Sequence, residues 1–226
     1  GFYKTTSHES TADDLASEKE KAKDWYKSFL RIQETNDLIW KGYEAIGKEQ
    51  YDLARLIFLP LAKQGDISAL YGMYHTYDPQ CKFPCQSPML DQKIYWLTKI
   101  AEQGDLDAPY ELGLLYLTKS SLNGYQTAFN IFLSLAEKGD AKAQERLGFM
   151  YEINAIGEDE KNDEKVLYWY TKAAEQGHGK AAQELGSAYH YGFNGVLKDE
   201  EKSYYWYKIG AEAGNLESQR MYSFSF

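Results

Sequence analysis

A short phrase that ends near a glycine recurs five times along the chain, and it constrains the fold more than any other feature. Its copies read LAKQGD, IAEQGD, LAEKGD, AAEQGH and GAEAGN, with their glycines at Gly65, Gly104, Gly139, Gly177 and Gly214. These glycines are 39, 35, 38 and 37 residues apart. A near-constant spacing of this size indicates stacked supersecondary units, each of which buries its apolar side against its neighbours.

Other positions keep phase with the repeated glycine. Four residues after it comes a small residue, and eight residues before it a large apolar one. Leu-Gly pairs follow three of the glycines by eight and nine residues, at Leu112-Gly113, Leu147-Gly148 and Leu185-Gly186. These offsets place an apolar stripe on each of two helices per unit. We therefore predict helix pairs in which the repeated glycine, in the left-handed conformation, ends the second helix. The mid-helix glycine would let another helix pack against bare backbone.

At these residues the chain resembles the Sel1-like repeat family, a relative of the tetratricopeptide repeats. The family pattern A-x-x-x-L-G-x-x-Y matches Ala181–Tyr189, the G-x-x-x-D loop matches Gly195–Asp199, and the ending W-Y-x-K-A-A-E-Q-G matches Trp169–Gly177. The resemblance covers residues 36–226. It implies an all-α fold, a right-handed α/α solenoid of helix-turn-helix repeats.

The repeat also divides the chain into expected segments. We expect residues 1–10 to be disordered or derived from a tag, and a capping helix over 11–35 to carry Trp25, Phe29 and Ile32 on one side. A second capping helix is expected over 215–226. The five helix pairs between the caps are expected at 36–65, 66–104, 105–139, 140–177 and 178–214.

Charge and hydropathy narrow the classes of partner. The chain has 25 Lys and Arg against 34 Asp and Glu, a formal net charge of −9. Because phosphate binding needs clustered basic residues, nucleic acid is not an expected partner. No apolar stretch approaches the roughly 20 residues that a membrane span needs. The start, GFYKTTSHES, is too polar for a signal peptide, but an export signal already removed stays open. We expect a monomer without a cofactor.

The two cysteines lie in one segment, YDPQCKFPCQSPMLD, as Cys81 and Cys85. A zinc site would need four ligands, and only His75 is near. A redox-active pair usually has two intervening residues rather than three. Two free thiols and a structural disulfide remain, and we favour the disulfide because exposed thiols are a liability. A disulfide would imply an oxidising compartment, so we expect a periplasmic or exported protein, with a cytoplasmic one as the alternative.

Motifs of catalysis are missing from the sequence. It contains no G-x-S-x-G, H-E-x-x-H, phosphate-binding glycine loop or C-x-x-C. Some relatives in the resembled family have been linked to penicillin binding, but the S-x-x-K and K-T-G motifs of that chemistry are absent. We expect no metal ligands, because the acidic loop at 154–165 does not have EF-hand spacing. The protein is therefore not expected to be an enzyme.

Resemblance to the tetratricopeptide arrangement indicates which residues would bind a partner. In that arrangement the first helix of each pair lines a concave groove, with residues 3, 6, 10 and 13 positions after each glycine pointing into it. The mixture of aromatic, aliphatic and charged residues at these positions is typical of protein-binding patches. The expected groove residues are Tyr43, Tyr71, His75, Asp107, Tyr110, Leu114, Leu117, Lys142, Glu145, Phe149, Glu152, Lys180, Gln183, Ser187 and His190.

Two hypotheses follow. The first is a non-catalytic scaffold that holds another protein in the groove. Its more specific form is a bacterial immunity protein that neutralises a secreted toxin or effector, because members of the resembled family have that role. The alternative is a cell-envelope enzyme of β-lactam or peptidoglycan-binding type, against which the missing nucleophile motif counts.

Overall fold

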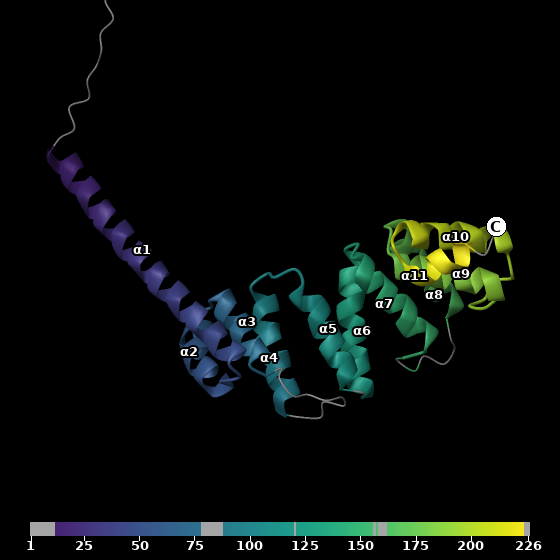
Figure 1. The fold of residues 1–226 in the computed structure, drawn as a ribbon, viewed down its shortest axis with the longest axis horizontal. Coiled ribbons are helices and arrows are strands. Elements are labelled where there is room, and N and C mark those ends of the chain that lie inside the picture. The colour runs from purple at the N-terminus through teal and green to yellow at the C-terminus, as the bar shows by residue number, and fades with distance from the viewer. Residues whose placement is uncertain (1–11, 78–87, 120, 156, 158–161, 224–226) are drawn as a thin grey trace, which may run out of the picture. The chain divides into compact units, whose positions relative to one another are not determined.

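Helices make up the regular structure of the chain. The computed structural model describes residues 12–77, 88–119, 121–155, 157 and 162–223. Over these residues the chain forms eleven helices and no strand (Figure 1). It divides into two compact units, Gly1–Pro79 and Gln80–Phe226, with α1 to α3 in the first and α4 to α11 in the second.

The first unit is built around one aromatic ring. It contains α1 (Ala12–Gly47), α2 (Tyr51–Lys63) and α3 (Ile67–His75). The ring of Phe58 on α2 is fully buried. A Cβ atom would lie 2.4 Å from this ring at Gly42 of α1 and 2.6 Å from it at Gly72 of α3. The absence of a side chain at both glycines therefore leaves room for the ring.

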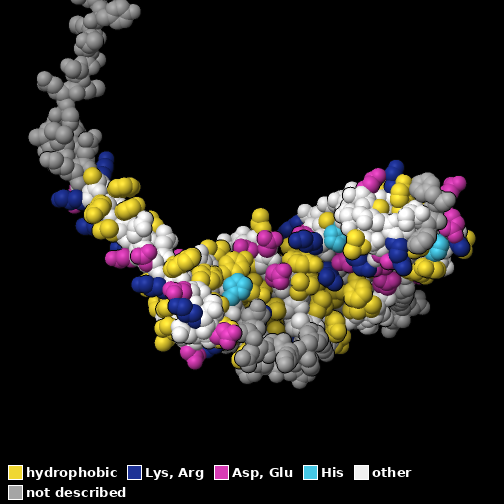
Figure 2. All heavy atoms as spheres, viewed as in Figure 1, with side chains coloured by type: hydrophobic (Ala, Val, Ile, Leu, Met, Phe, Trp, Pro, Cys, Tyr) yellow, Lys and Arg dark blue, Asp and Glu magenta, His cyan; other side chains and the backbone are white. Residues whose placement is uncertain are grey.

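The N-terminal part of α1 presents its apolar side to solvent. The helix continues without a break through residues 35 and 36, where the capping helix and the first repeat were expected to meet. Trp25, Phe29 and Ile32 are 68%, 42% and 58% exposed. Figure 2 shows hydrophobic side chains along this part of the helix. Only the last turns of α1 thus contribute to the core of the unit.

The second unit contains eight helices that pack in the order of the sequence. Each one contacts the next along the chain, and α11 also contacts α9. We call α5, α7, α9 and α11 first helices, because each follows a repeated glycine, and α4, α6, α8 and α10 second helices. Their bounds are α4 (Pro88–Glu102), α5 (Ala108–Thr118), α6 (Leu122–Glu137), α7 (Ala141–Glu152), α8 (Asp163–Glu175), α9 (Gly179–Tyr191), α10 (Glu200–Glu212) and α11 (Leu216–Ser223).

The repeated phrase forms the turn between one pair and the next. Its glycine has a positive φ in all five copies, from +80° at Gly177 to +96° at Gly139, so the predicted left-handed helix end is confirmed. The side chain of the residue after the glycine accepts a hydrogen bond from the backbone N–H three residues further on, at the start of the following helix. At Asp140 a side-chain oxygen accepts a hydrogen bond of 2.7 Å from the backbone N–H of Ala143. One six-residue phrase therefore stops one helix and starts the next.

Aromatic rings fill the space above the mid-helix glycines, which confirms the predicted close packing. A Cβ atom added to any of these glycines would lie 2.6 to 2.7 Å from a ring on the following second helix, too close for two carbon atoms. The pairs are Gly113 with Phe132, Gly148 with Tyr170 and Gly186 with Tyr207.

Two further predictions from the sequence concern membrane spans and the two cysteines. No helix among the described residues is long and apolar enough to cross a membrane. Cys81 and Cys85 lie outside the described residues, and so do residues 1–10.

Candidate functional site

Three of the expected groove residues lie in the first unit. The hydroxyl of Tyr43 on α1 donates a hydrogen bond of 3.0 Å to the carbonyl of Ser68, and its ring meets Phe58 edge-on. Burial, and then the charge of Asp66, raises the pKa of Tyr43. On α3 the rings of Tyr71 and His75 stack with centroids 6.3 Å apart. Tyr43 therefore fastens α1 to the start of α3.

The other expected residues lie in the second unit, and all but one share its first helices. Asp107 is the exception, since it precedes α5 as its N-cap and is exposed. We call the rest the first-helix face. It consists of Tyr110, Leu114 and Leu117 on α5, Lys142, Glu145, Phe149 and Glu152 on α7, and Lys180, Gln183, Ser187 and His190 on α9.

Two first helices meet through Tyr110. Arg146 of α7 donates a hydrogen bond of 3.2 Å from Nε to the Tyr110 hydroxyl. The Lys142 ammonium lies 5.9 Å from the centroid of the same ring, within the range of a cation–π contact. Tyr110, Leu114 and Leu117 also pack partly against the hydrophobic core. The α5 part of the face is therefore half-buried and serves the packing of the unit.

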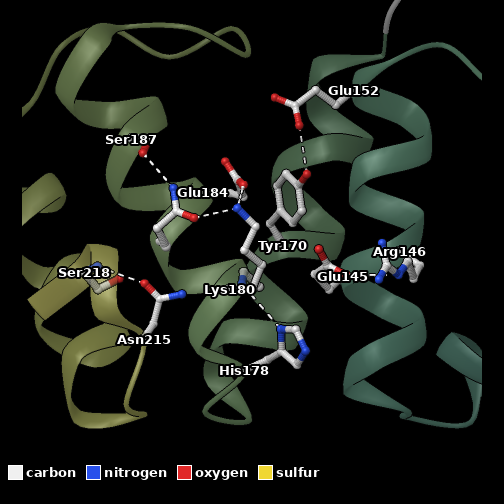
Figure 3. Close-up of polar contacts among 12 residues, drawn as sticks. Glu145, Arg146, Glu152, Tyr170, His178, Lys180, Glu184, Ser187, Asn215 and Ser218 are labelled. Carbon is white, nitrogen blue, oxygen red and sulfur yellow. Dashed lines mark hydrogen bonds and ion pairs between the residues drawn. The ribbon is translucent and has the colours of Figure 1, made fainter.

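Glu145 is a buried carboxylate on this face. It is only 7% exposed, and its Oε2 lies 3.6 Å from Nε of Arg146. Burial raises the pKa of Glu145 despite the opposing charges of Arg146 and of Lys180, which α9 carries (Figure 3). Glu184 adds to the rise. A charge held in such a position costs folding energy unless it is well paired.

Glu152 is fully engaged within the chain. Its Oε2 accepts a hydrogen bond of 2.8 Å from the hydroxyl of Tyr170 on α8 (Figure 3). Its Oε1 accepts a second one, of 3.1 Å, from Nδ2 of Asn194 in the loop after α9. Burial, followed by the charge of Glu152, raises the pKa of Tyr170. The carboxylate thus joins α7 to α8 and to the loop after α9.

A chain of polar contacts runs along α9. Lys180 pairs with Glu184 and donates a hydrogen bond of 2.6 Å to Oε1 of Gln183. Gln183 donates through Nε2 to Ser187 at 3.3 Å, and Ser187 lies 3.0 Å from the Tyr207 hydroxyl. The Ser187 hydroxyl therefore has a phenol and an amide as neighbours, a pair that supplies no base to activate it.

His190 ends the expected row on α9. Its Nδ1 lies 3.3 Å from Oε2 of Glu200, at the start of α10. No group of three metal-ligating side chains occurs among the residues that the structure describes. The first-helix face therefore offers charged groups, hydrogen-bonding groups and apolar surface with which another molecule could be bound.

Three members of the first-helix face keep exposed side chains. They are Phe149, which is 40% exposed, and the two lysines Lys142 and Lys180. Phe149 and Lys142 are seven residues apart on α7, so they lie on the same side of that helix. We call these three the accessible patch. The Phe149 ring lies outside the hydrophobic core. The polar side chains of Glu145, Glu152, Gln183 and Ser187 on the same face instead form ion pairs or hydrogen bonds within the chain.

Sequence reasoning missed several residues that organise this face. Tyr170 and Tyr207 reach it from the second helices, and Asn194 reaches it from a loop. A signal for two of them was present, because a large residue recurs seven positions before each repeated glycine. Those residues are Phe58, Leu97, Phe132, Tyr170 and Tyr207. Nothing periodic marked Asn194.

Comparisons with known proteins agree with this architecture. The family model described as Sel1 repeat matches residues 94–105, 141–178 and 179–215. A search of the curated proteins finds no match.

Two solved structures share the fold. A Sel1 repeat protein from Oxalobacter formigenes is 27% identical, with a TM-score of 0.53, over 82% of this chain and 72% of that one. A protective antigen of uropathogenic Escherichia coli strains, which displays an SLR fold, is 29% identical, also with a TM-score of 0.53. That match covers 74% of this chain but only 37% of the antigen. The predicted all-α solenoid of helix pairs is thereby confirmed, and the chain is similar to Sel1 repeat proteins over these residues.

Proposed function

We propose that this protein is a non-catalytic scaffold that binds another protein through the accessible patch of the first-helix face. Sel1 repeat proteins generally serve as scaffolds for protein interaction. The observation that carries the proposal is Phe149, an aromatic side chain 40% exposed on a helix whose other large hydrophobic residues are buried. Exposed aromatic side chains of this kind are enriched at the centres of protein interfaces.

Photo-crosslinking tests the position of the site. A photoreactive phenylalanine analogue at position 149 should capture one dominant protein from the source organism. The same analogue at position 168 is the matched control, because Tyr168 is also an exposed aromatic residue but lies on the second helix α8. Equal capture from both positions would contradict a site on the first-helix face.

The captured partner then allows a measurement of affinity. Replacing Phe149 with Ser should weaken binding about tenfold or more, as expected for loss of an aromatic anchor, whereas Tyr168→Ser should leave it unchanged. Tyr110 and Glu145 are poorer choices, because both contact Arg146 and their replacement would also alter the packing of α5 and α7. Binding by Phe149→Ser at the parent affinity would move the site elsewhere.

The charge and the class of the partner are a more specific part of the proposal. The net charge of −9 favours the approach of a protein that is basic overall, while Lys142 and Lys180 of the accessible patch favour an acidic surface at the contact itself. A secreted antibacterial effector would suit this charge and the family resemblance, and would give the protein an immunity role in the periplasm. Co-expression with an effector encoded beside this chain should then restore growth, and Phe149→Ser should reduce that protection. Full protection by the variant, or none by the parent, would contradict the immunity role.

A further inference from the structure

A cavity of about 400 Å³ opens between the start of α5 and one side of α6, in the middle of the second unit. Its volume falls within the usual range of ligand sites. None of the described residues that line it belongs to the first-helix face. They include the apolar side chains of Pro109, Ile131 and Leu135 and the polar ones of Asn130, Ser134 and Lys138.

The α6 side of the cavity lacks two aromatic rings that the other second helices carry. On α4, α8 and α10 a tyrosine and a tryptophan stand nine and eight residues before the repeated glycine. In each of these pairs the two rings meet edge-on, with centroids 4.8 to 5.0 Å apart. The pairs are Tyr95 with Trp96, Tyr168 with Trp169 and Tyr205 with Trp206. On α6 the same two positions hold Asn130 and Ile131.

The packing of the helices fixes this correspondence. The residue that follows each of these positions is the ring that covers a mid-helix glycine, Phe132 on α6 and Tyr170 on α8. Ile131 therefore stands on its helix where Trp169 stands on α8. Trp169 packs against the hydrophobic core. A smaller side chain at the equivalent place leaves space that the chain itself does not fill.

The α5 side departs from the repeat at the same place, because it holds a proline. In α7 and α9 the residue five positions after the glycine is Gln144 or Ala182, and both are buried. The N–H of each donates a hydrogen bond of 3.0 to 3.1 Å to the carbonyl of the residue after the glycine. Pro109 has no N–H, so α5 cannot begin with this bond and starts at Ala108 instead. Leu106, just before that start, is 88% exposed.

The cavity combines apolar walls with a single cation. Ile131 and Leu135 are half-buried, and such aliphatic walls suit a flat ring. Lys138 is exposed at the end of α6, and none of the described lining residues is acidic. The Asn130 amide can donate through Nδ2, because its Oδ1 accepts from Gln126 at 3.4 Å. A ligand that carries an aromatic ring and a carboxylate would match both the walls and the cation.

We propose that this cavity binds a small aromatic carboxylic acid. The ring lies against Pro109, Ile131 and Leu135, in the space left by the missing tyrosine and tryptophan, and the carboxylate pairs with Lys138. The site is separate from the first-helix face, so this proposal does not depend on the proposed function.

Indole-3-acetate is the probe, and the δ1 methyl resonances of isoleucine in the full-length protein locate its binding. The Ile131 resonance is the one that is absent from the spectrum of Ile131→Val. Ile67, which is 41% exposed on α3, reports non-specific contact. We expect the Ile131 resonance to shift in a saturable way at millimolar ligand while that of Ile67 stays in place. An unmoved Ile131 resonance, or an equal shift at Ile67, would overturn the proposal.

Indole-3-acetamide tests the part played by charge, because it keeps the ring and removes the carboxylate. The net charge of −9 and the C-terminal end of α6 both repel an anion, so tighter binding of the acid would report Lys138. Lys138→Gln should weaken the acid about threefold, as expected for loss of an exposed ion pair, and leave the amide unchanged. Lys208→Gln, at an exposed position of α10, is the matched control and should change neither. Equal binding of acid and amide by the parent would contradict the proposed ligand class.

Filling the cavity tests the place of the ring. Ile131→Trp restores the residue that the other second helices carry and should abolish binding, measured by saturation transfer from protein to ligand. Circular dichroism checks that this variant folds, and Lys138→Gln, at an exposed position, gives a test that does not depend on it. A folded Ile131→Trp variant that binds indole-3-acetate like the parent would place the ligand elsewhere and overturn the proposal.

Discussion

At the scale of the single residue, Glu145 is the side chain whose burial has the clearest energetic consequence. Burial raises its pKa from the ordinary 4.5, so the folded protein holds the charged form less well than the unfolded chain does. Its contribution to stability is therefore greatest below pH 4.5 and is lost as the pH rises through the raised pKa.

Replacing Glu145 with Gln should accordingly stabilise the protein at neutral pH. The amide keeps the shape of the side chain and removes the buried charge. The gain in the free energy of unfolding should be largest near pH 7 and shrink toward pH 4.5, as measured by urea denaturation across that range. Glu111→Gln, at an exposed position of α5, is the matched control and should change little. A variant less stable than the parent at pH 7 would show that the Arg146 pair outweighs the cost of burial.

At the scale of the element, His178 occupies a position that favours an acid. It is the N-cap of α9, where Asp140 and Asp66 stand in the equivalent turns. Its Nδ1 accepts a hydrogen bond of 3.4 Å from Ala181, longer than the 2.7 Å bond at Asp140. Burial, with the charge of Arg146, lowers the pKa of His178. Its protonation would abolish the cap, so stability is lost as the pH falls below 6.5.

Replacement of His178 by Asp should therefore stabilise α9 by about 0.5–1 kcal/mol, since a carboxylate caps well and complements the helix dipole. The difference from the parent should widen between pH 7 and pH 5, because the parent weakens there while the aspartate stays charged. Thermal unfolding at several pH values measures it. A constant difference across this range would mean that the imidazole does not cap the helix in the parent.

The ends of the helices show which features of the fold could be predicted from the sequence and which could not. The phrase around Gly139 combined a left-handed helix end with the cap Asp140, so both helix ends were predictable from local chemistry. The length of α1 was not, because no glycine or proline interrupts residues 35 and 36 and the heptad-like apolar spacing of Trp25, Phe29 and Ile32 is the same whether a helix is covered or exposed. Whether the apolar side of a helix is covered depends on the neighbouring elements, and the local sequence pattern contains no information about them.

The first-helix face shows the same limit. The offsets from the repeated glycine predicted that its residues lie on first helices, but they did not predict which contacts each side chain makes within the chain. Glu145 and Glu152 stand on the same helix at comparable offsets, yet one carries a buried charge and the other accepts hydrogen bonds from Tyr170 and Asn194. Those partners come from α8 and from the loop after α9, so the role of each carboxylate is fixed by tertiary contacts. Phe149, Lys142 and Lys180 keep exposed side chains, and their role in binding a partner stays a prediction.

At the scale of the whole molecule, each helix packs mainly on its neighbours in sequence, and the chain divides into two compact units. In such an array stability is approximately a sum of units and of nearest-neighbour interfaces. A local defect in the second unit should therefore weaken the helices around it and leave the first unit as it was. Gly148 is the place to introduce one, because a Cβ there would lie 2.6 Å from the ring of Tyr170.

Gly148→Ala should cost about 1–3 kcal/mol through overpacking, although alanine is the better helix former. Hydrogen exchange followed by mass spectrometry should show the amides of α7 and α8 losing about tenfold or more in protection, while those of α2 and α3 exchange as in the parent. Gly47→Ala is the control, because a Cβ at the end of α1 would meet nothing within 4 Å. Equal loss of protection in α2 and α3 would mean that the two units unfold as one cooperative body, and the nearest-neighbour description of this chain would then be wrong.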